Sequence, residues 1–377
     1  MSNILIKEVK TKKEIKAFID FPIKLFKDVQ NFVPYMYSDE LKVLNHKTTY
    51  EKEATSIFYL AYKDNKVVGR ISGIIQHTYN SKMNISQARF TRFDCINDLE
   101  VATALFNQVK AWAKAQKMTS LVGPLDYSDL EREGLLIEGF DEVMTFEEQY
   151  HPPYYKDLIS ANGFEKEIDW FEFQLTYDKE SDEKIAKLAK GVRRLAKVKV
   201  ADMNIPRAKY ISKYKKPVFD LIDICYGKLY GTMPLNEETR DGIISQFGPL
   251  LQPEYLPVVE NDKGEVIAFG LCFPAIGDAL RKSGGKLTLP ALIKMLKLIN
   301  KPKALELCLV AVHPDYQNTG INALFLEDIY KTFKEKNVQY CETNLNLETN
   351  TAVISQWKHF NARQHKRRRC YKISLQD

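Results

Sequence analysis

A Leu- and Val-rich run followed by a glycine-containing loop is the part of this 377-residue chain best suited to binding an anion. Residues 305–325 read LELCLVAVHPDYQNTGINALF, with a polar loop over residues 315–319 and Gly320 ahead of an apolar helical pattern. The first N–H groups of a helix have no internal partner, and the helix dipole adds positive charge there. Glycine also lets a phosphate approach the backbone without a Cβ in the way. We therefore predict an anion site where this helix begins.

Glu306 is the candidate general base. It lies in the predicted strand, eleven residues before Gln317, and strand alternation places it on one face with Cys308 and Val310. A carboxylate on a face that lines a cleft can accept a proton from an amine nucleophile. The alternative is an ordinary edge or surface glutamate. A covalent route through Cys308 is disfavoured, because no histidine is placed to activate the thiol.

The elements that must position these residues occur twice along the chain. Residues 56–75 and 255–274 each read as a hairpin, and each hairpin is followed by a further strand. A long helix comes next, near residues 99–116 in the first half and 321–336 in the second, and then a strand at 120–124 or 338–345. The order β-β-β-α-β-α-β predicts two copies of one α/β (α+β) fold, with chance similarity as the alternative.

The length supports this duplication. A chain of 377 residues exceeds the roughly 250–300 at which one hydrophobic core stops growing. Hydrophobic residues make up 45% and charged residues 28%, which excludes a disordered, collagen-like or coiled-coil chain. We expect domains over residues 1–178 and 179–377, with the junction at TYDKESD (176–182).

The net charge of +6 is too small to indicate a nucleic-acid binder, so we expect no nucleic-acid partner. The positive charge gathers near residues 190–199, 294–303 and 363–369. The run RQHKRRR (363–369) favours a solubilising surface strand, with a cofactor phosphate, an acidic acceptor or RNA as alternatives. The second half also carries an insertion over residues 277–304, with a helix predicted at 290–300.

The six cysteines form no CxxC pair, which favours buried reduced thiols over disulfides or metal ligands, and we expect no metal site. No run approaches 18 consecutive apolar residues, and the N-terminus lacks the features of a secretion signal. We therefore expect a cytoplasmic protein without a membrane partner.

The loop and its surroundings resemble the GNAT (Gcn5-related N-acetyltransferase) superfamily. QNTGIN (317–322) resembles the family's Q/R-x-x-G-x-G/A loop, and VAVHPDY (310–316) resembles its V-x-P-x-Y/F lead-in. The resemblance implies two tandem GNAT-like domains. The first lacks the phosphate loop, because residues 93–99 (FDCINDL) hold no glycine and carry Asp94 and Asp98. In the first half, PPYY (152–155) through Gly163-Phe164 resembles the family's fourth helix.

The resemblance also implies a cofactor and roles for particular residues. Acetyl-CoA or another acyl-CoA would be bound by the backbone at the strand end and by the loop. The cofactor-binding residues would be Val310, Val312, Gln317, Asn318, Thr319, Gly320, Ile321, Asn322 and, at the start of the fourth helix, Asn350. The acceptor, a small-molecule or peptide amine, would meet a wall formed by Tyr226, Tyr230 and Met233, with simple packing as the alternative.

Two positions depart from the family pattern. Asn322 stands where Gly or Ala is usual, and Trp357 stands where the family often has the Tyr that protonates the leaving thiolate. The expected function is acyl-CoA-dependent N-acyl transfer by direct attack in a ternary complex. The alternatives are a non-catalytic binding protein of the same fold and an aminoacyl-tRNA-dependent peptidyl transferase-like enzyme.

Overall fold

The computed structural model describes residues 4–376, which divide into two compact units. The first unit comprises Met1–Phe171, Gly277–Ile293 and His365–Asp377, and the second comprises Glu172–Ile276 and Lys294–Gln364. Each unit thus contains discontinuous pieces of the chain. The expected boundary between residues 178 and 179 stays a prediction.

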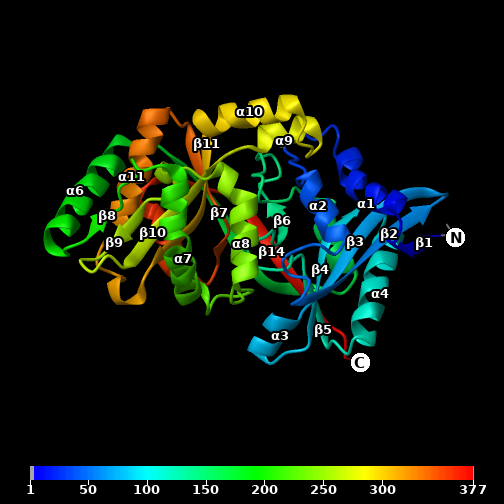
Figure 1. Ribbon diagram of the computed structural model, residues 1–377. Helices are drawn as coiled ribbons and strands as arrows, with labels where there is room; N and C mark the ends of the chain where they lie inside the picture. The colour runs from blue at the N-terminus through cyan, green and yellow to red at the C-terminus, as the bar shows by residue number, and fades with distance from the viewer. Residues whose placement is uncertain (1–3, 377) are drawn as a thin grey trace. The chain divides into compact units, whose positions relative to one another are not determined.

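The first unit is a sheet with helices on both faces (Figure 1). Its elements are β1 (Leu5–Glu8), α1 (Lys12–Leu25), α2 (Tyr37–Leu44), β2 (Ala54–Lys63), β3 (Lys66–Gln76), α3 (His77–Met83), β4 (Gln87–Cys95), α4 (Leu99–Ala115), β5 (Ser120–Gly123), β6 (Leu135–Glu138), α5 (Tyr154–Ala161) and α9 (Gly277–Ser283). It also contains parts of β7 (Glu165–Thr176), α10 (Leu289–Asn300) and β14 (Asn361–Ser374).

The predicted hairpin of the first half is β2–β3. Its turn residues Asp64 and Asn65 both have positive φ, the conformation that a two-residue hairpin turn requires. Helix α4 packs on one face of β3 so closely that a Cβ added to Gly73 would lie 2.7 Å from the Trp112 ring. Arg70 of β3 extends from the opposite face toward α1, where it donates to the Phe18 carbonyl. This second face positions the charged groups described below.

The second unit has the same kinds of element. They are α6 (Lys179–Leu195), β8 (Lys199–Val200), α7 (Arg207–Tyr226), α8 (Glu237–Phe247), β9 (Val258–Glu260), β10 (Val266–Pro274), β11 (Ala304–Val312), the short helix η3 (Pro314–Tyr316), α11 (Asn322–Lys336), β12 (Tyr340–Thr343), β13 (Asn346–Leu347) and α12 (Thr351–Ile354), with the remaining parts of β7, α10 and β14.

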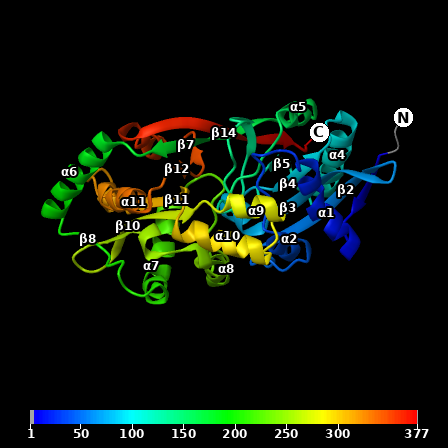
Figure 2. The same ribbon diagram turned by 90° about the horizontal axis from the view of Figure 1, so that it is seen from above.

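Its sheet runs in the order β12-β11-β10-β9-β8. Helices α6 and α11 cover one face and α7 and α8 the other (Figure 2). Gly270 of β10 permits the close approach of α11, because an added Cβ would lie 2.8 Å from Phe325. The buried core on the α11 side includes Leu305 and Leu307 of β11, so the intervening Glu306 points to the α7 and α8 side.

The structure confirms the repeated order. Strands β2, β3, β4, helix α4, β5, α5 and β7 of the first half match β9, β10, β11, α11, β12, α12 and β14 of the second. The predicted insertion helix is α10. Of the six free cysteines, Cys95, Cys272, Cys341 and Cys370 are buried, and Cys225 and Cys308 are half-buried.

The basic run 363–369 differs from the solvated surface strand that its charge favours. Lys366 and Arg368 of β14 are buried in the first unit. Arg368 pairs with Glu148 at 3.3 Å, and both Arg367 and Arg369 donate to Asp169. The run holds β14 in the fold because buried acids match its charges, a pairing that no local sequence pattern reveals.

Candidate functional site

Strands β11 and β12 run parallel and then separate. Their pairing extends from Ala304 opposite Tyr340 to Leu307 opposite Thr343, and one further hydrogen bond joins Asn344 N to the Leu307 carbonyl at 2.9 Å. Strand β11 continues to Val312, paired with β10 alone. The edge of β11 that faces away from β10 therefore offers its backbone groups to other partners over residues 308–312.

Helix α7 supplies one of those partners. The Tyr226 hydroxyl donates to the Val310 carbonyl at 2.9 Å and accepts from the Val310 N–H at 3.2 Å. The Val312 carbonyl accepts from the Cys225 thiol and, at 3.3 Å, from the Gln317 amide. Burial raises the pKa of Cys225 to about 11, so this thiol stays protonated near neutral pH. A single phenol thus satisfies both backbone groups of Val310.

The loop after β11 leaves a row of backbone donors at the start of α11. Asn318 and Gly320 have positive φ (62° and 81°), which turns the chain sharply before the helix. Ile321 caps α11 without a side-chain hydrogen bond. Within residues 4–376, the backbone N–H groups of residues 318–322 make no backbone hydrogen bond of normal geometry, although residues 317–321 form a turn. Such a row, at the positive end of a 15-residue helix, can bind a phosphate.

The residues flanking this loop have structural partners of their own. The side-chain amide of Asn322 donates to Gln356 at 3.0 Å. Asn350 caps α12 by accepting from Val353 N. Trp357 is buried in the core, and its indole N–H donates to Asn346 at 3.0 Å. The predicted helix start at Asn350 is confirmed, and Trp357 serves packing.

Glu306 lies in the middle of β11, with 4% of its surface exposed. In the parallel register its neighbour on β12 is Glu342, also buried, so the two carboxylates extend from the same face of the sheet. On the other side Glu306 is opposite Phe273 of β10, which stacks on Phe247 of α8. The structure thus places Glu306 under α7 and α8, four residues before the backbone groups that Tyr226 contacts.

The other predicted acceptor residues follow α7 directly. Tyr230 is half-buried in the segment between α7 and α8, and Met233 in the same segment is buried. Burial of Met233 agrees with the packing alternative for this side chain. A role for Tyr226 and Tyr230 in binding an acceptor remains a prediction.

The corresponding place in the first unit is built differently. Three residues separate β4 from α4, whereas nine separate β11 from α11. The Asp98 carboxylate caps α4 by accepting from Glu100 N and Val101 N, and it also pairs with Lys63 at 2.7 Å. The bound Lys63 ammonium, followed by the two backbone donors, holds the pKa of Asp98 below its ordinary value. The helix start in this unit already holds its own anion.

Two tyrosines occupy the end of β4. The Tyr155 hydroxyl accepts from Cys95 N at 2.9 Å, and the Tyr154 hydroxyl donates to the Cys95 carbonyl at 2.9 Å. Both phenols come from α5 of the same unit. Burial raises the pKa of Tyr155 well above its ordinary value, so it remains a neutral hydroxyl.

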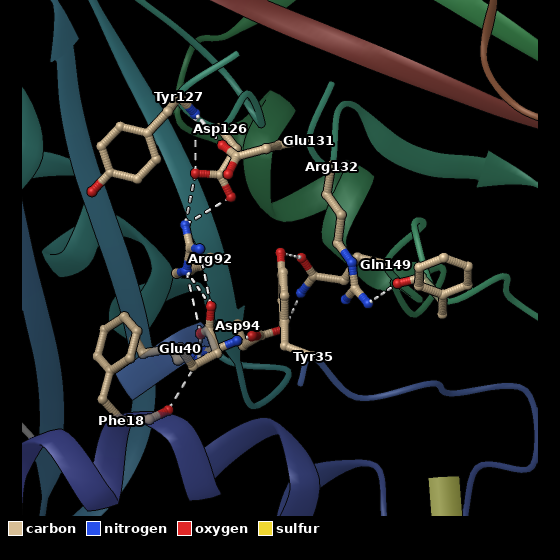
Figure 3. Close-up of polar contacts among 12 residues, drawn as sticks. Phe18, Tyr35, Glu40, Arg92, Asp94, Asp126, Tyr127, Glu131, Arg132 and Gln149 are labelled. Carbon is tan, nitrogen blue, oxygen red and sulfur yellow. Dashed lines mark hydrogen bonds and ion pairs between the residues drawn. The ribbon is translucent and has the colours of Figure 1, made fainter. Parts of the chain in front are cut away.

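A buried ion network fills the space beside β4 (Figure 3). Arg92 binds the Asp126 carboxylate through two contacts of 2.8–2.9 Å and pairs with Glu40 of α2 at 2.9 Å. Arg70 pairs with Asp94 at 2.8 Å and with Glu40 at 3.5 Å. Burial alone would raise the pKa of Glu40, but the Arg92 and Arg70 charges outweigh it and the pKa is lowered. For Asp94 burial prevails, and its pKa is raised.

Sequence reasoning missed this network. It placed Asp94 in the absent phosphate loop but assigned no role to Glu40, Arg92 or Asp126. The available signal was a strand, QARFTRFDC, with charges on an otherwise apolar pattern; such charges are tolerated inside a protein only when paired. The partners come from segments 52 and 34 residues away, which a local pattern does not reveal.

No family model matches the chain. It is 26% identical over 380 residues to protein YghO of Escherichia coli (strain K12), covering 98% of this chain and 95% of YghO. It is also 26% identical over 284 residues to the bacterial ceramide synthase of Caulobacter vibrioides, covering 74% of this chain and 72% of that enzyme. Within the described residues, no helix is long and apolar enough to cross a membrane.

Among the solved structures that match the fold across the chain, two illustrate the likeness. A tandem GNAT protein from the clavulanic acid biosynthesis pathway has a TM-score of 0.60 at 11% identity, covering 100% of this chain and 99% of its own. A GCN5-related N-acetyltransferase from Sphaerobacter thermophilus has a TM-score of 0.53 at 10% identity, with coverages of 99% and 96%. With the repeated element order, these matches show that the chain has the fold of the tandem GNAT proteins.

Proposed function

We propose that this protein is an acyl-CoA-dependent N-acyltransferase whose second unit binds the acyl donor. The observation that carries the proposal is the row of backbone N–H groups at residues 318–322, which follows a positive-φ turn and precedes α11. Those donors suit the pyrophosphate of coenzyme A. The nearby edge of β11 suits the amides of its pantetheine arm, which would replace the Tyr226 hydroxyl at Val310. Asn322 leaves room for this ligand, because its side chain is held by Gln356.

In the proposed reaction the amine nitrogen attacks the thioester carbonyl, the C–S bond breaks, and the amine proton passes to Glu306 directly or through water. The coenzyme A thiolate leaves and takes a proton from solvent. The position of Glu306 on the face beneath α7 and α8, four residues from Val310, supports this role. Backbone donors of β11 would polarise the thioester carbonyl.

The proposed acceptor is a long-chain lipid amine. The similarity to a bacterial ceramide synthase over three-quarters of the chain supports this choice, because a ceramide is the amide of a fatty acid with a long-chain base. A fatty acyl-CoA would then be the donor. A small soluble amine remains the second choice within the same chemistry.

The test is a turnover assay with acyl donors from acetyl-CoA to palmitoyl-CoA against a long-chain amino alcohol and soluble amines. Amide formation with free coenzyme A as co-product is expected, and its absence with every pair contradicts the proposal. Glu306→Gln should lower turnover about 100-fold and leave donor affinity within about twofold. Glu342→Gln is the matched control, because Glu342 is the buried carboxylate that lies beside Glu306 in the parallel pairing of β11 and β12.

A second candidate is a binding protein that does not catalyse transfer. The Tyr226 hydroxyl satisfies both backbone groups of Val310, and Trp357 is a core residue with no acidic proton to give. Tight coenzyme A binding without turnover on any acceptor would favour this candidate. Turnover that depends on Glu306 would exclude it.

A further inference from the structure

Helix α10 is apolar on both sides, although only one side is covered. Ala291, Met295, Leu298 and Ile299 are buried against the protein. On the outer side, four large apolar side chains are exposed at the spacing i, i+3, i+4, i+7: Leu289, Leu292, Ile293 and Leu296. We call these four residues the α10 stripe. Leu289 is 72% exposed and Leu296 is 60% exposed.

Such a stripe is unusual on a water-facing helix. The spacing i, i+3, i+4, i+7 normally marks the face that a helix buries, whereas scattered single exposed leucines need no explanation. Here that spacing occurs on the exposed side of a helix whose other side is already packed. The α10 stripe is therefore expected to be covered by something outside this chain.

The charge around α10 indicates what covers it. Between Asp278 and Glu306 the chain has seven Lys or Arg residues and no Asp or Glu. This segment alone carries more positive charge than the net +6 of the whole chain. Lys286, Lys297, Lys301 and Lys303 are all exposed. An apolar stripe bordered by lysines suits the surface of a lipid bilayer with anionic headgroups, where apolar burial and electrostatic attraction add.

We infer that α10 docks this protein on an anionic membrane surface, with the α10 stripe inserted among the headgroups. Docking at a surface needs no spanning helix, so it agrees with the finding that none is present within the described residues. It departs from the expectation of no membrane partner, which rested on the lack of a long apolar run. The inference goes beyond the proposed function and gives a lipid amine a route to the enzyme.

The test is co-flotation of the full chain with vesicles of phosphatidylcholine alone and with about one quarter phosphatidylglycerol, at about 0.1 M salt. The wild type should float with the anionic vesicles and bind the neutral ones at least about tenfold less. Leu289→Ser with Leu296→Ser should lower binding to anionic vesicles about tenfold or more. Raising the salt to about 0.5 M should weaken the wild-type binding.

The matched control is Leu188→Ser with Leu195→Ser on α6. These leucines have the same i, i+7 spacing and similar exposure, 59% and 78%, and residues 184–201 around them likewise carry seven Lys or Arg and no Asp or Glu. They form no stripe, because Gly191 and the buried Val192 stand where the α10 stripe has its two middle members. This variant should bind vesicles like the wild type. Both double variants change exposed side chains, so their thermal unfolding midpoints should match the wild type and show that each is folded.

Three results would overturn the inference. The wild type could fail to float with anionic vesicles, the α10 variant could bind as well as the wild type, or the α10 and α6 variants could lose binding equally. A concentration-dependent dimer that only the α10 variant loses, without vesicle binding, would assign the stripe to a second copy of the chain. Vesicle binding is measured without an acyl donor, so its failure is distinct from loss of acyl transfer to a soluble amine.

Discussion

Strands β4 and β11 occupy the same place in the two copies of the fold. They differ in how the backbone groups at the strand end and at the start of the following helix are hydrogen-bonded. At the end of β4, Tyr154 and Tyr155 hold the backbone of Cys95, and Asp98 supplies the anion at the start of α4. At the end of β11, one phenol holds Val310. Within the described residues, α11 has no capping side chain, and the N–H groups of residues 318–322 make no backbone hydrogen bond of normal geometry.

The difference shows how two copies of one fold can have different roles. In the first unit, the Asp98 carboxylate and a three-residue loop occupy the place that would hold a phosphate. In the second unit, a nine-residue loop with two positive-φ residues leaves it open. The first unit therefore already holds an anion of its own at this place, and the proposed donor site lies in the second unit.

The largest effect is expected in the first unit, from Arg92→Met. Removing this guanidinium leaves the buried carboxylates of Glu40 and Asp126 without their main partner, which should lower the free energy of unfolding by about 3–5 kcal/mol. Denaturant unfolding measures this loss. The control Arg193→Met removes a half-exposed pair with Glu327 in the second unit and should cost about 1 kcal/mol or less. Equal losses would contradict a structural role for the buried network.

The next largest effect is expected from Gly320→Val, in the loop between β11 and α11. Gly320 has φ of 81°, and a Cβ there would lie 3.4 Å from Val192 of α6, so a branched side chain should distort the row of N–H groups. Coenzyme A affinity, measured by calorimetry, should fall about 100-fold, which is about 2.7 kcal/mol. Gly264→Val is the control, since its φ of 79° brings the same backbone strain, and within the described residues an added Cβ meets no atom beyond its chain neighbours within 4 Å. Retained affinity in Gly320→Val would refute the loop assignment.

A smaller effect is expected from Asp98→Ala, which removes the cap of α4. The variant should be less stable by about 1 kcal/mol at neutral pH. Because the pKa of Asp98 is lowered in the folded state, the ionised form is the stabilising one. Its contribution is present above the unfolded pKa of about 4 and is lost as the pH falls through the folded value. Unfolding curves at several pH values should show the difference in the free energy of unfolding between the variant and the wild type shrinking in acid. A difference that grows in acid would contradict the assignment.

The smallest effect is expected from Tyr226→Phe. The variant removes the hydroxyl that bonds Val310 N and O while keeping the ring, so the donor no longer competes for those groups. Coenzyme A should bind about three- to fivefold tighter, because the ligand no longer has to break the hydrogen bonds between the Tyr226 hydroxyl and Val310. Each such bond contributes roughly 1 kcal/mol, and water bound to Val310 in the variant offsets part of that free energy. Weaker binding would instead make the hydroxyl a contact of the donor. Tyr154→Phe in the first unit should leave coenzyme A affinity unchanged.

Local patterns were enough for much of the architecture. Turn residues and β-branched content predicted both hairpins. Helical spacing predicted α4 and α11, and the prolines at its two ends predicted α10, each helix to within a residue or two. The loop at residues 317–322 was recognisable because its glycine and flanking elements are contiguous. The proposed anion site therefore rests on neighbouring residues alone.

Contacts between distant segments were not predictable in the same way. The pairing of Arg92 with Glu40 and of Arg368 with Glu148 depends on residues far apart in the chain. The Tyr226 hydroxyl on Val310 joins residues 84 positions apart, and its geometry follows from the packing of α7 on the sheet. The basic run was misread for the same reason, since its acids lie in other elements.

Hydrogen-exchange mass spectrometry of the full chain, with and without acetyl-CoA, tests the central claim most directly. The account predicts slower exchange on binding in peptides that cover residues 310–324, where the row of backbone N–H groups lies, and no change in peptides that cover residues 93–101. Slower exchange at residues 93–101, or no change at 310–324 when the ligand is in saturating excess, would contradict the assignment of the donor site to the second unit.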